Sequence, residues 1–389
     1  MKAFTVDAEW APKADYEVTA REKEIKRANC GSQVWRNPVF EMKDISIPEI
    51  GDDDLLVKVE RCGICGSDSH LYETDDDGYI IFSGPVKLPC VIGHEYAGVV
   101  EAVGKNVRTF KPGERICAES IVWCGKCPTC RSGAVNQCQN VELAGITVDG
   151  ALAEYVLVSE LQCWNIDSLS DIYSDDQVFE IGSLVEPLGC AYNGMFISAG
   201  GFLPGSSLVV YGAGPIGLGA VALGRLAGAS KIMVFDVIPE RLEIAKKMGA
   251  DFVFDINELK GNGLRARDMV MELTKGRGAE VQVEAAGAAN ATVPEMENSL
   301  AVNGTIVYLG RAATRTPILL DALVSGANAI VGARGHAGYG IYDNLIRLLA
   351  TGRLQVSDMI TSTYGFDETM QALKKSVDRT DGKILVKIP

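Results

Sequence analysis

The chain has 389 residues, of which 47% are hydrophobic and 23% charged, a balance that predicts two or three folded domains and excludes a largely disordered protein. It carries 37 basic and 51 acidic residues, and the formal charge of −14 excludes a basic footprint for nucleic acid or an anionic membrane. We expect no secretory leader and no membrane span. The odd number of cysteines, 11, favours metal ligation over disulfides and hence a reducing, cytoplasmic location.

The first half of the chain contains short β-type runs that Gly and Pro interrupt, for example Leu55–Val59, Val99–Val103 and Ala153–Val158. Such runs predict a compact β-rich domain. The acidic run that begins at Asp75 and ends at Gly78 predicts an exposed turn, and we expect Asp175 and Asp176 in another loop.

The second half alternates between strand-type and helix-type runs. The expected strands are Ser207–Tyr211, Lys231–Phe235, Glu280–Glu284 and Thr305–Leu309, and the expected helices are Gly217–Ala227 and Pro239–Met248. This alternation predicts βαβ units with a parallel sheet, so the fold class is α/β. From about Gly335 the alternation fades into two helices, near Tyr342–Ala350 and Asp367–Ser376, and a last strand, Lys383–Ile388.

A glycine motif follows the first strand of this second half. It has the pattern G-x-G-x-x-G and is formed by Gly212, Ala213, Gly214, Pro215, Ile216 and Gly217. Between a strand and an apolar helix, such glycines allow a tight turn and a close approach of the pyrophosphate of a dinucleotide. Asp236 ends the next strand, where an acid hydrogen-bonds the ribose hydroxyls and repels a 2′-phosphate, which favours NAD over NADP. Arg241 lies either near the adenosine or on a solvent-facing helix.

Four cysteines cluster with the spacing C-x2-C-x2-C-x7-C, at Cys124, Cys127, Cys130 and Cys138. Four thiolates fill a tetrahedral zinc shell and leave no open position, which predicts a structural site. An iron–sulfur cluster is the competing interpretation.

A second set of metal-ligand types is dispersed. Cys65 lies in the run Gly-Ile-Cys-Gly-Ser-Asp-Ser-His, His94 and Glu95 follow Gly93, and Glu186 lies in Leu-Val-Glu-Pro-Leu. Mixed sulfur, nitrogen and oxygen donors suit a catalytic zinc with an open coordination position. From the sequence spacing alone, His94 is as compatible with a structural role, and Glu186 with a position at the start of a helix, as either is with metal binding.

With these motifs in this order, the chain resembles the zinc-dependent medium-chain alcohol and polyol dehydrogenases from Leu55 to its end. The resemblance implies a GroES-like β-rich catalytic domain over residues 1–187, a Rossmann domain with a doubly wound parallel sheet over 188–334, and a segment, 335–389, that returns to the first domain. It also implies an NAD-dependent enzyme that forms homodimers or homotetramers. In the alcohol dehydrogenase branch of the family the third zinc ligand is a second Cys. This chain has Glu186 at that position, as the sorbitol and threonine dehydrogenase-like branch has a Glu.

The resemblance assigns roles to individual residues. Cys65, His94 and Glu186 would bind a catalytic zinc, with Glu95 beside it and able to enter its shell, and the four clustered cysteines would bind a second zinc. Ser67 would pass the substrate proton to His70 while hydride moves to NAD. Cys62 and Cys90 match no ligand position and are expected to be buried thiols.

Two segments exceed the common family length, residues 11–37 and 73–88. Together with the Ser183–Pro187 run they resemble the scyllo-inosose dehydrogenase type of cyclitol-oxidising member, so we expect a polyol, sugar or cyclitol substrate. Asp75, Asp76, Asp77, Tyr79 and Ser83 are candidate partners for its hydroxyls, and His336 either reaches the substrate or sits in a turn. The alternatives are a threonine, simple secondary-alcohol or diol dehydrogenase and an inactive nucleotide-binding homologue. A DNA-binding zinc protein is disfavoured, because the region of the four cysteines has too few basic residues to bind phosphates.

Overall fold

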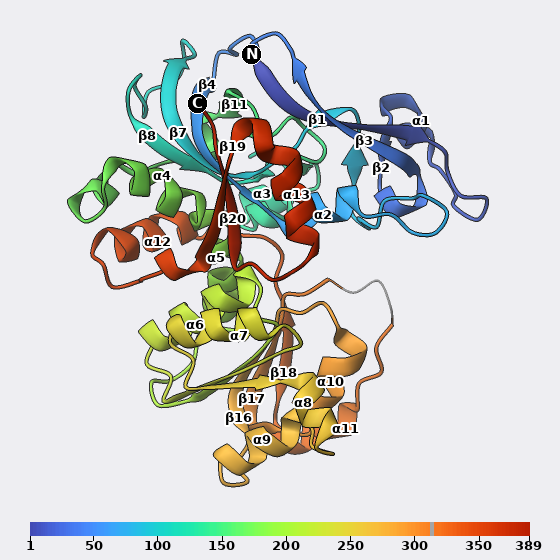
Figure 1. The fold of residues 1–389 in the computed structure, drawn as a ribbon, viewed down its shortest axis with the longest axis vertical. Coiled ribbons are helices and arrows are strands. Elements are labelled where there is room, and N and C mark those ends of the chain that lie inside the picture. The colour runs from blue at the N-terminus through green and yellow to red at the C-terminus, as the bar shows by residue number, and fades with distance from the viewer. Residues whose placement is uncertain (312–314) are drawn as a thin grey trace. The chain divides into compact units, whose positions relative to one another are not determined.

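The computed structural model describes residues 1–311 and 315–389, and the chain divides into two compact units (Figure 1). Unit 1 comprises Met1–Glu186, Ser362–Asp378 and Lys383–Pro389, and unit 2 comprises Pro187–Thr361 and Arg379–Gly382. The chain therefore returns to unit 1 at its end. The sequence-based boundaries at residues 187 and 334 stay a prediction.

Unit 1 is built on an antiparallel sheet with the order β12-β8-β7-β4-β20-β19, in which β11 also pairs with β4. Its strands are β4 (Asp54–Ile64), β7 (Glu95–Val103), β8 (Arg115–Ala118), β11 (Tyr155–Ser159), β12 (Cys163–Asn165), β19 (Ile360–Gly365) and β20 (Lys383–Lys387). The central strand β4 has buried side chains on both faces over most of its length. The predicted β-rich domain is thus present.

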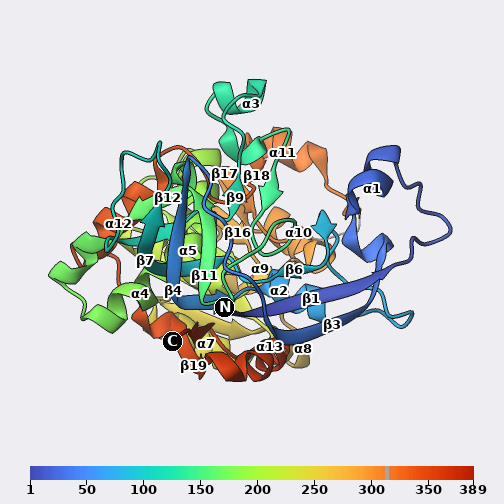
Figure 2. The ribbon, with the colours of Figure 1, turned by 90° about the horizontal axis from the view of Figure 1, so that it is seen from above.

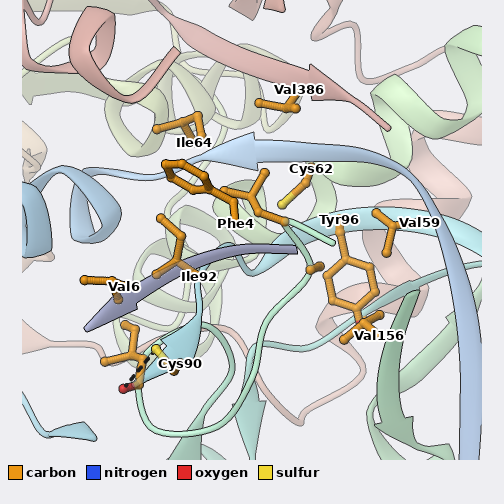
Figure 3. Packing of buried hydrophobic residues seen from close by; sticks show 14 of the residues in the cluster. Phe4, Val6, Val59, Cys62, Ile64, Cys90, Ile92, Tyr96, Val156 and Val386 are labelled. Carbon is orange, nitrogen blue, oxygen red and sulfur yellow. Dashed lines mark hydrogen bonds between the residues drawn. The ribbon is translucent and has the colours of Figure 1, made fainter. Parts of the chain in front are cut away.

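The core of unit 1 lies between this sheet and the N-terminal strands. Figure 3 shows Phe4 and Val6 of β1 packed near Ile92 and the β4 side chains Cys62 and Ile64. Cys62 and Cys90 are both buried, and burial raises the pKa of each thiol above its ordinary value. These two cysteines are core side chains, as predicted.

A smaller sheet with the order β3-β1-β6 carries the N-terminal excursion, the name used below for residues 11–37. Its strands are β1 (Lys2–Trp10), β3 (Trp35–Asp44) and β6 (Cys90–Val91). Helix α1 (Ala20–Ile25) and a separate pair of strands, β2 (Arg27–Ala28) and β5 (Val86–Lys87), accompany it. Figure 2 shows β1 and β3 running out toward α1 at one side of unit 1. Residues 73–88, called the α2–β6 segment below, join α2 (Gly66–Tyr72) to β6.

The remaining elements of unit 1 are short. They are β9 (Ile121–Val122), α3 (Pro128–Arg131), β10 (Glu142–Leu143), α4 (Asp175–Ser183), α5 (Val185–Tyr192), which continues into unit 2, and α13 (Thr369–Val377). The expectation of a loop at Asp175 and Asp176 was wrong, because both begin α4. Ser174 caps this helix and Gln177 completes a capping box, and acids in a first helical turn favour the helix dipole.

Unit 2 contains a parallel sheet with the order β15-β14-β13-β16-β17-β18 within the described residues. Its strands are β13 (Ser207–Tyr211), β14 (Lys231–Asp236), β15 (Phe252–Asp255), β16 (Ala279–Glu284), β17 (Leu300–Tyr308) and β18 (Ala329–Gly332). Counted along the chain this order is 3-2-1-4-5-6, the doubly wound Rossmann order. The predicted α/β fold class is confirmed.

Helices connect and accompany these strands (Figure 1). They are α6 (Pro215–Leu226), α7 (Pro239–Lys247), α8 (Ile256–Gly261), α9 (Ala266–Leu273), α10 (Ala289–Glu297), α11 (Leu320–Gly326) and α12 (Ile341–Ala350). The crevice at the carboxyl ends of β13 and β16, where the strand order reverses, is the place where doubly wound sheets bind ligands. Among the described residues, no helix combines the length and apolar composition that crossing a membrane requires.

Candidate functional site

The four clustered cysteines come together around α3. Their sulfur atoms all lie within 4.8 Å of one another, and Cys127 Sγ lies 3.9 Å from Cys138 Sγ. Two thiolates bound to one zinc at 2.3 Å in a tetrahedron lie about 3.8 Å apart. The spacing of the sulfur atoms thus fits a tetrahedral zinc site. Figure 2 shows α3 projecting from the sheet of unit 1.

Backbone and side-chain groups lower the pKa of two of these thiols, Cys124 and Cys127, whereas burial raises the pKa of Cys130 to about 12. The Cys127 amide donates to Cys124 Sγ at 3.4 Å, and the Asn140 amide donates to Cys138 Sγ at 3.3 Å. The Thr129 hydroxyl, followed by backbone N–H groups, lowers the pKa of Cys127 to about 5. Thiolates are the form that binds metal, so this lobe is prepared for a cation.

The dispersed set comes from the ends of two strands of unit 1 and from the helices α2 and α5. Cys65 follows β4 and caps α2, His94 and Glu95 stand at the start of β7, and Glu186 lies in α5. The donor atoms of Cys65, His94 and Glu95 lie within 4.8 Å of one another; this group does not include Glu186. The structure therefore brings three of the four predicted residues into a single cluster.

His94 is buried between two side chains of α2. Its Nε2 atom lies 3.4 Å from Ser67 Oγ, and its Nδ1 atom lies 3.8 Å from Asp68 Oδ1. Within the described residues neither Nδ1 nor Asp68 Oδ1 has a hydrogen-bond partner. A carboxylate behind one ring nitrogen orients the other toward a metal, which fits His94 as a ligand through Nε2.

Several acidic groups lie close to His94. Burial alone would lower the pKa of His94, but Cys65, Asp68 and Glu186 raise it well above its ordinary value. Glu95 forms a buried ion pair with Lys383, whose Nζ also donates to the Ile64 carbonyl at 3.1 Å. Lys383 balances one acidic group, and burial raises the pKa of Asp68 and of Glu95. A divalent metal ion would offset the cost of holding these carboxylates charged.

Glu186 is held at the edge of this cluster. Its Oε1 atom accepts a hydrogen bond of 2.8 Å from the Ser120 hydroxyl, in the short connection between β8 and β9. Its charge still reaches the cluster, because it raises the pKa of Lys383 together with Glu95, against the effect of burial. The role of Glu186 as a metal ligand together with Cys65 and His94 stays a prediction.

The glycine motif of unit 2 has the geometry that each glycine requires. Gly212 has φ +93°, and a Cβ there would meet the Ala286 backbone nitrogen at 2.7 Å; a Cβ on Gly217 would meet the Gly212 carbonyl at 1.8 Å. A Cβ on Gly214 would approach only the Arg241 guanidinium, at 3.5 Å. The space over Gly214 at the start of α6 can therefore admit a pyrophosphate, and α6 begins at Pro215, two residues before the predicted start at Gly217.

Asp236 and Arg241 both lie beside this motif. One carboxylate oxygen of Asp236 accepts the Ala213 amide at 2.5 Å, and the other accepts the amides of Val237 and Ile238. Arg241 is anchored by its Nε donating to the Asp381 carbonyl at 3.1 Å. Asp236 thus fixes the glycine loop, and its contact with a ribose stays a prediction.

Sequence reasoning missed three residues that the structure places at the dispersed cluster. Asp68 had a usable signal, since it stands three residues after Cys65 and accepts the Cys65 amide at 2.8 Å in a capping box. Lys383 and Ser120 had no such sequence signal, because only the folding of distant segments brings them to the cluster. His336 is 1% exposed and packs against Tyr342 and Gly189 in unit 2, so it is a core side chain.

Comparisons with known proteins identify the family. The family model "Alcohol dehydrogenase GroES-like domain" matches residues 51–168, and "Zinc-binding dehydrogenase" matches residues 215–351. Scyllo-inosose 3-dehydrogenase of Thermotoga maritima is 37% identical over 100% of this chain and 99% of its own length, and L-threonine 3-dehydrogenase of Alteromonas mediterranea is 30% identical over 94% and 99%. A solved Thermotoga maritima structure described as an alcohol dehydrogenase superposes with a TM-score of 0.94, at 34% identity over 99% of both chains.

The chain belongs to the zinc-binding alcohol dehydrogenase family. The predicted resemblance and the predicted enzyme class, an oxidoreductase acting on CH–OH groups with a nicotinamide dinucleotide and zinc, are confirmed. Two of the solved structures that the chain resembles contain NADP and NADH.

Proposed function

We propose that the protein oxidises a secondary hydroxyl of a polyol, sugar or cyclitol, with scyllo-inosose as the leading candidate, and transfers the hydride to NAD. The observation that carries this proposal is the buried group of Cys65, His94 and Glu95 with the Glu186 carboxylate at its edge. Its mixed donors fit a catalytic zinc, which lowers the pKa of a bound alcohol when present. The similarity to a scyllo-inosose 3-dehydrogenase supports the substrate class.

In this proposal the residues of the chain hold and move protons around the cluster. Cys65, His94 and Glu186 hold the catalytic zinc, and Glu95 stands next to it, tied to Lys383. Ser67 lies 3.4 Å from His94 Nε2, so its hydroxyl is placed to take the proton of an alcohol bound at the cluster. His70, one helical turn further along α2, would pass that proton on. The four clustered cysteines hold a second, structural zinc.

The cofactor preference rests on Asp236. A fixed carboxylate beside the glycine loop accepts the two ribose hydroxyls of NAD and repels the 2′-phosphate of NADP. Arg241 stands near enough to contact the same adenosine half. We therefore propose NAD as the physiological acceptor, and a wild-type enzyme with a higher kcat/KM for NADP would contradict this.

A polyhydroxylated substrate fits the oxygen-rich donors of this cluster better than a simple alcohol. Glu186 in place of a thiolate makes the site harder and more compatible with vicinal hydroxyls. Sites that pair substrate hydroxyls reject analogues that lack them, because their own polar groups are then left unpaired. L-Threonine is the second candidate, since a threonine dehydrogenase is also among the relatives.

A steady-state screen of NAD reduction or NADH oxidation tests the substrate. Its panel is scyllo-inosose, myo-inositol, glucose, sorbitol, L-threonine and 1-butanol, compared by kcat/KM. We expect a cyclitol or polyol to rank first. A preference for 1-butanol would overturn the polyol proposal, and a preference for L-threonine would overturn the cyclitol refinement.

We also propose that the protein is a cytoplasmic homo-oligomer. Its eleven cysteines form no disulfide, which supports a reducing compartment.

Strand β18 ends the parallel sheet, and α11 nearby exposes Leu320 and Val324 at 69% and 79%. An uncovered strand edge beside apolar side chains fits a two-fold contact between copies. Light scattering should give at least a dimer mass, and a monomer would contradict the proposal.

A further inference from the structure

The N-terminal excursion is the backbone partner of almost the whole α2–β6 segment. The hydrogen bonds run from Asn37 N to Gly78 O at 2.8 Å, Ile80 N to Trp35 O at 3.2 Å, Ser32 N to Phe82 O at 2.9 Å and Gly31 N to Gly84 O at 2.8 Å. Strands β2 and β5 then pair Arg27 with Lys87 and Ala28 with Val86. Two segments that are separated in the sequence by most of β3, by β4 and by α2 thus form one folded body.

Side chains of the excursion also hold the acidic turn of the α2–β6 segment. Asp75 accepts Lys13 Nζ at 2.9 Å and the amides of Asp77 and Tyr79 at 3.1 and 2.9 Å. Lys13 Nζ lies 4.4 Å from the centroid of the Tyr79 ring, and the Arg36 guanidinium lies 5.6 Å from it. Arg36 Nε also donates to the Asp77 carbonyl at 2.6 Å. Asp75 is therefore engaged within the protein.

The α2–β6 segment in turn holds the helix that carries Ser67 and His70. The Glu73 amide donates to the Ser69 carbonyl at 2.8 Å, and the Phe82 amide donates to the His70 carbonyl at 3.1 Å. The Tyr72 ring meets Phe40 of β3 edge to face, with centroids 5.6 Å apart. Contacts thus lead without interruption from the excursion to the end of α2.

The excursion itself is fixed by a buried carboxylate. Glu22 is 2% exposed and accepts hydrogen bonds from the Tyr16 hydroxyl at 2.7 Å, the Thr19 hydroxyl at 2.8 Å and the amides of Thr19 and Asn29 at 2.9 and 2.8 Å. Trp10 stacks edge to face on Trp35, with centroids 5.1 Å apart, and Lys26 lies over Trp10. These contacts hold the N-terminal excursion in a defined structure.

We propose that the N-terminal excursion is a positioning element for substrate: by holding the α2–β6 segment, it sets the place of α2 and of the substrate hydroxyls that bind beside it. This inference rests on the proposed function for the substrate class only. Lys13 and Arg36 of the excursion hold the turn at Asp75. The backbone hydrogen bonds between the excursion and the α2–β6 segment position Phe82, whose amide binds the His70 carbonyl.

The test compares the double variant Lys13→Ala/Arg36→Ala with Lys105→Ala as a matched control. Lys105 pairs with Asp52 at 2.8 Å in the same unit, away from the Asp75 turn. Loss of a half-buried ion pair and two cation–π contacts predicts a rise of about fivefold to tenfold in KM for the preferred polyol. We expect kcat and the KM for NAD to change less than about twofold.

Two further readouts separate positioning from general damage. Hydrogen exchange should quicken in residues 66–88 of the double variant and stay unchanged in the control, and the variant Lys13→Arg/Arg36→Lys should restore the polyol KM. An unchanged polyol KM, or equal effects in the control, would overturn the inference. If the wild-type enzyme prefers L-threonine or 1-butanol, the proposed substrate class is wrong, and the same KM comparison with that substrate still decides the inference.

Discussion

The four-cysteine lobe and the dispersed cluster contrast in how they gather their donor atoms. The lobe takes four like donors from residues 124–138 and holds them with local N–H to sulfur bonds. The dispersed cluster takes unlike donors from Cys65 at the start of α2 and from His94 and Glu95 at the start of β7. A supporting residue lies farther away in the sequence, because Lys383 pairs with Glu95 across 288 residues. A local site can form with little help from the fold, whereas the dispersed site exists only once unit 1 is assembled.

This contrast matches the proposed chemistry of the two sites. Four thiolates complete a tetrahedral shell, so a metal there has no position for a substrate. At the dispersed cluster the Glu186 carboxylate accepts the Ser120 hydroxyl, Glu95 pairs with Lys383, and the Ser67 hydroxyl lies beside His94. These oxygen groups are available to an alcohol that binds there. The lobe should therefore contribute to stability and the cluster to turnover.

The largest expected effect is on turnover. The variant Cys65→Ser replaces a thiolate by a weak neutral donor, and kcat should fall about 10³-fold or more, since metal activation contributes several kcal/mol. Circular dichroism and the thermal midpoint should stay close to wild type. A kcat within tenfold of wild type would remove Cys65 from the proposed zinc shell.

The next effect is on folding. The variant Cys127→Ser breaks the four-thiolate shell, and binding of a structural zinc is coupled to folding, so the free energy of unfolding should drop by about 3 kcal/mol or more. Urea unfolding followed by fluorescence measures it. The protein that remains folded should keep kcat near wild type; a stable protein with lost activity would reverse the roles of the two sites.

A smaller effect is expected behind His94. The variant Asp68→Asn removes the carboxylate 3.8 Å from His94 Nδ1, and loss of such a partner weakens metal binding about 10- to 100-fold. Competition with a chelator should show weaker binding of one zinc and no change at the other, and Asp68→Glu should recover part of the loss. Equal weakening of both zinc ions would mean that Asp68 acts on the whole fold.

The smallest effect belongs to the excursion and depends on pH. Burial would raise the pKa of Glu22, but bonds from Asn29, Thr19 and Tyr16 lower it below its ordinary value of 4.5. A lowered folded-state pKa stabilises the protein above pH 4.5 and the stabilisation disappears as pH falls through the lowered value. The variant Glu22→Gln should thus be about 1 kcal/mol less stable at pH 7, with the difference from wild type shrinking below pH 4.5. A difference that grows on acidification would contradict this.

The sequence predicted best what local chemistry determines. The strand at Ser207–Tyr211 was placed correctly because the glycine motif marks its end, and the four-cysteine lobe because its members are neighbours. The helix at Asp175 was missed although Ser174 and Gln177 form a capping box. Nothing in residues 11–37 and 73–88, each polar and turn-rich, indicated that they are each other's partners. The Lys383–Glu95 pair likewise follows from the β20–β4–β7 register and from no motif.

The central claim, two zinc sites with separate roles, is tested most directly by metal analysis of three purified proteins: wild type, Cys65→Ser and Cys127→Ser. Each would be dialysed against a mild chelator, and zinc would be measured per chain alongside kcat. We predict two zinc ions in the wild type, one in folded Cys65→Ser without turnover, and one in whatever Cys127→Ser remains folded, with turnover retained. A single zinc in the wild type, or two in active Cys65→Ser, would contradict the account.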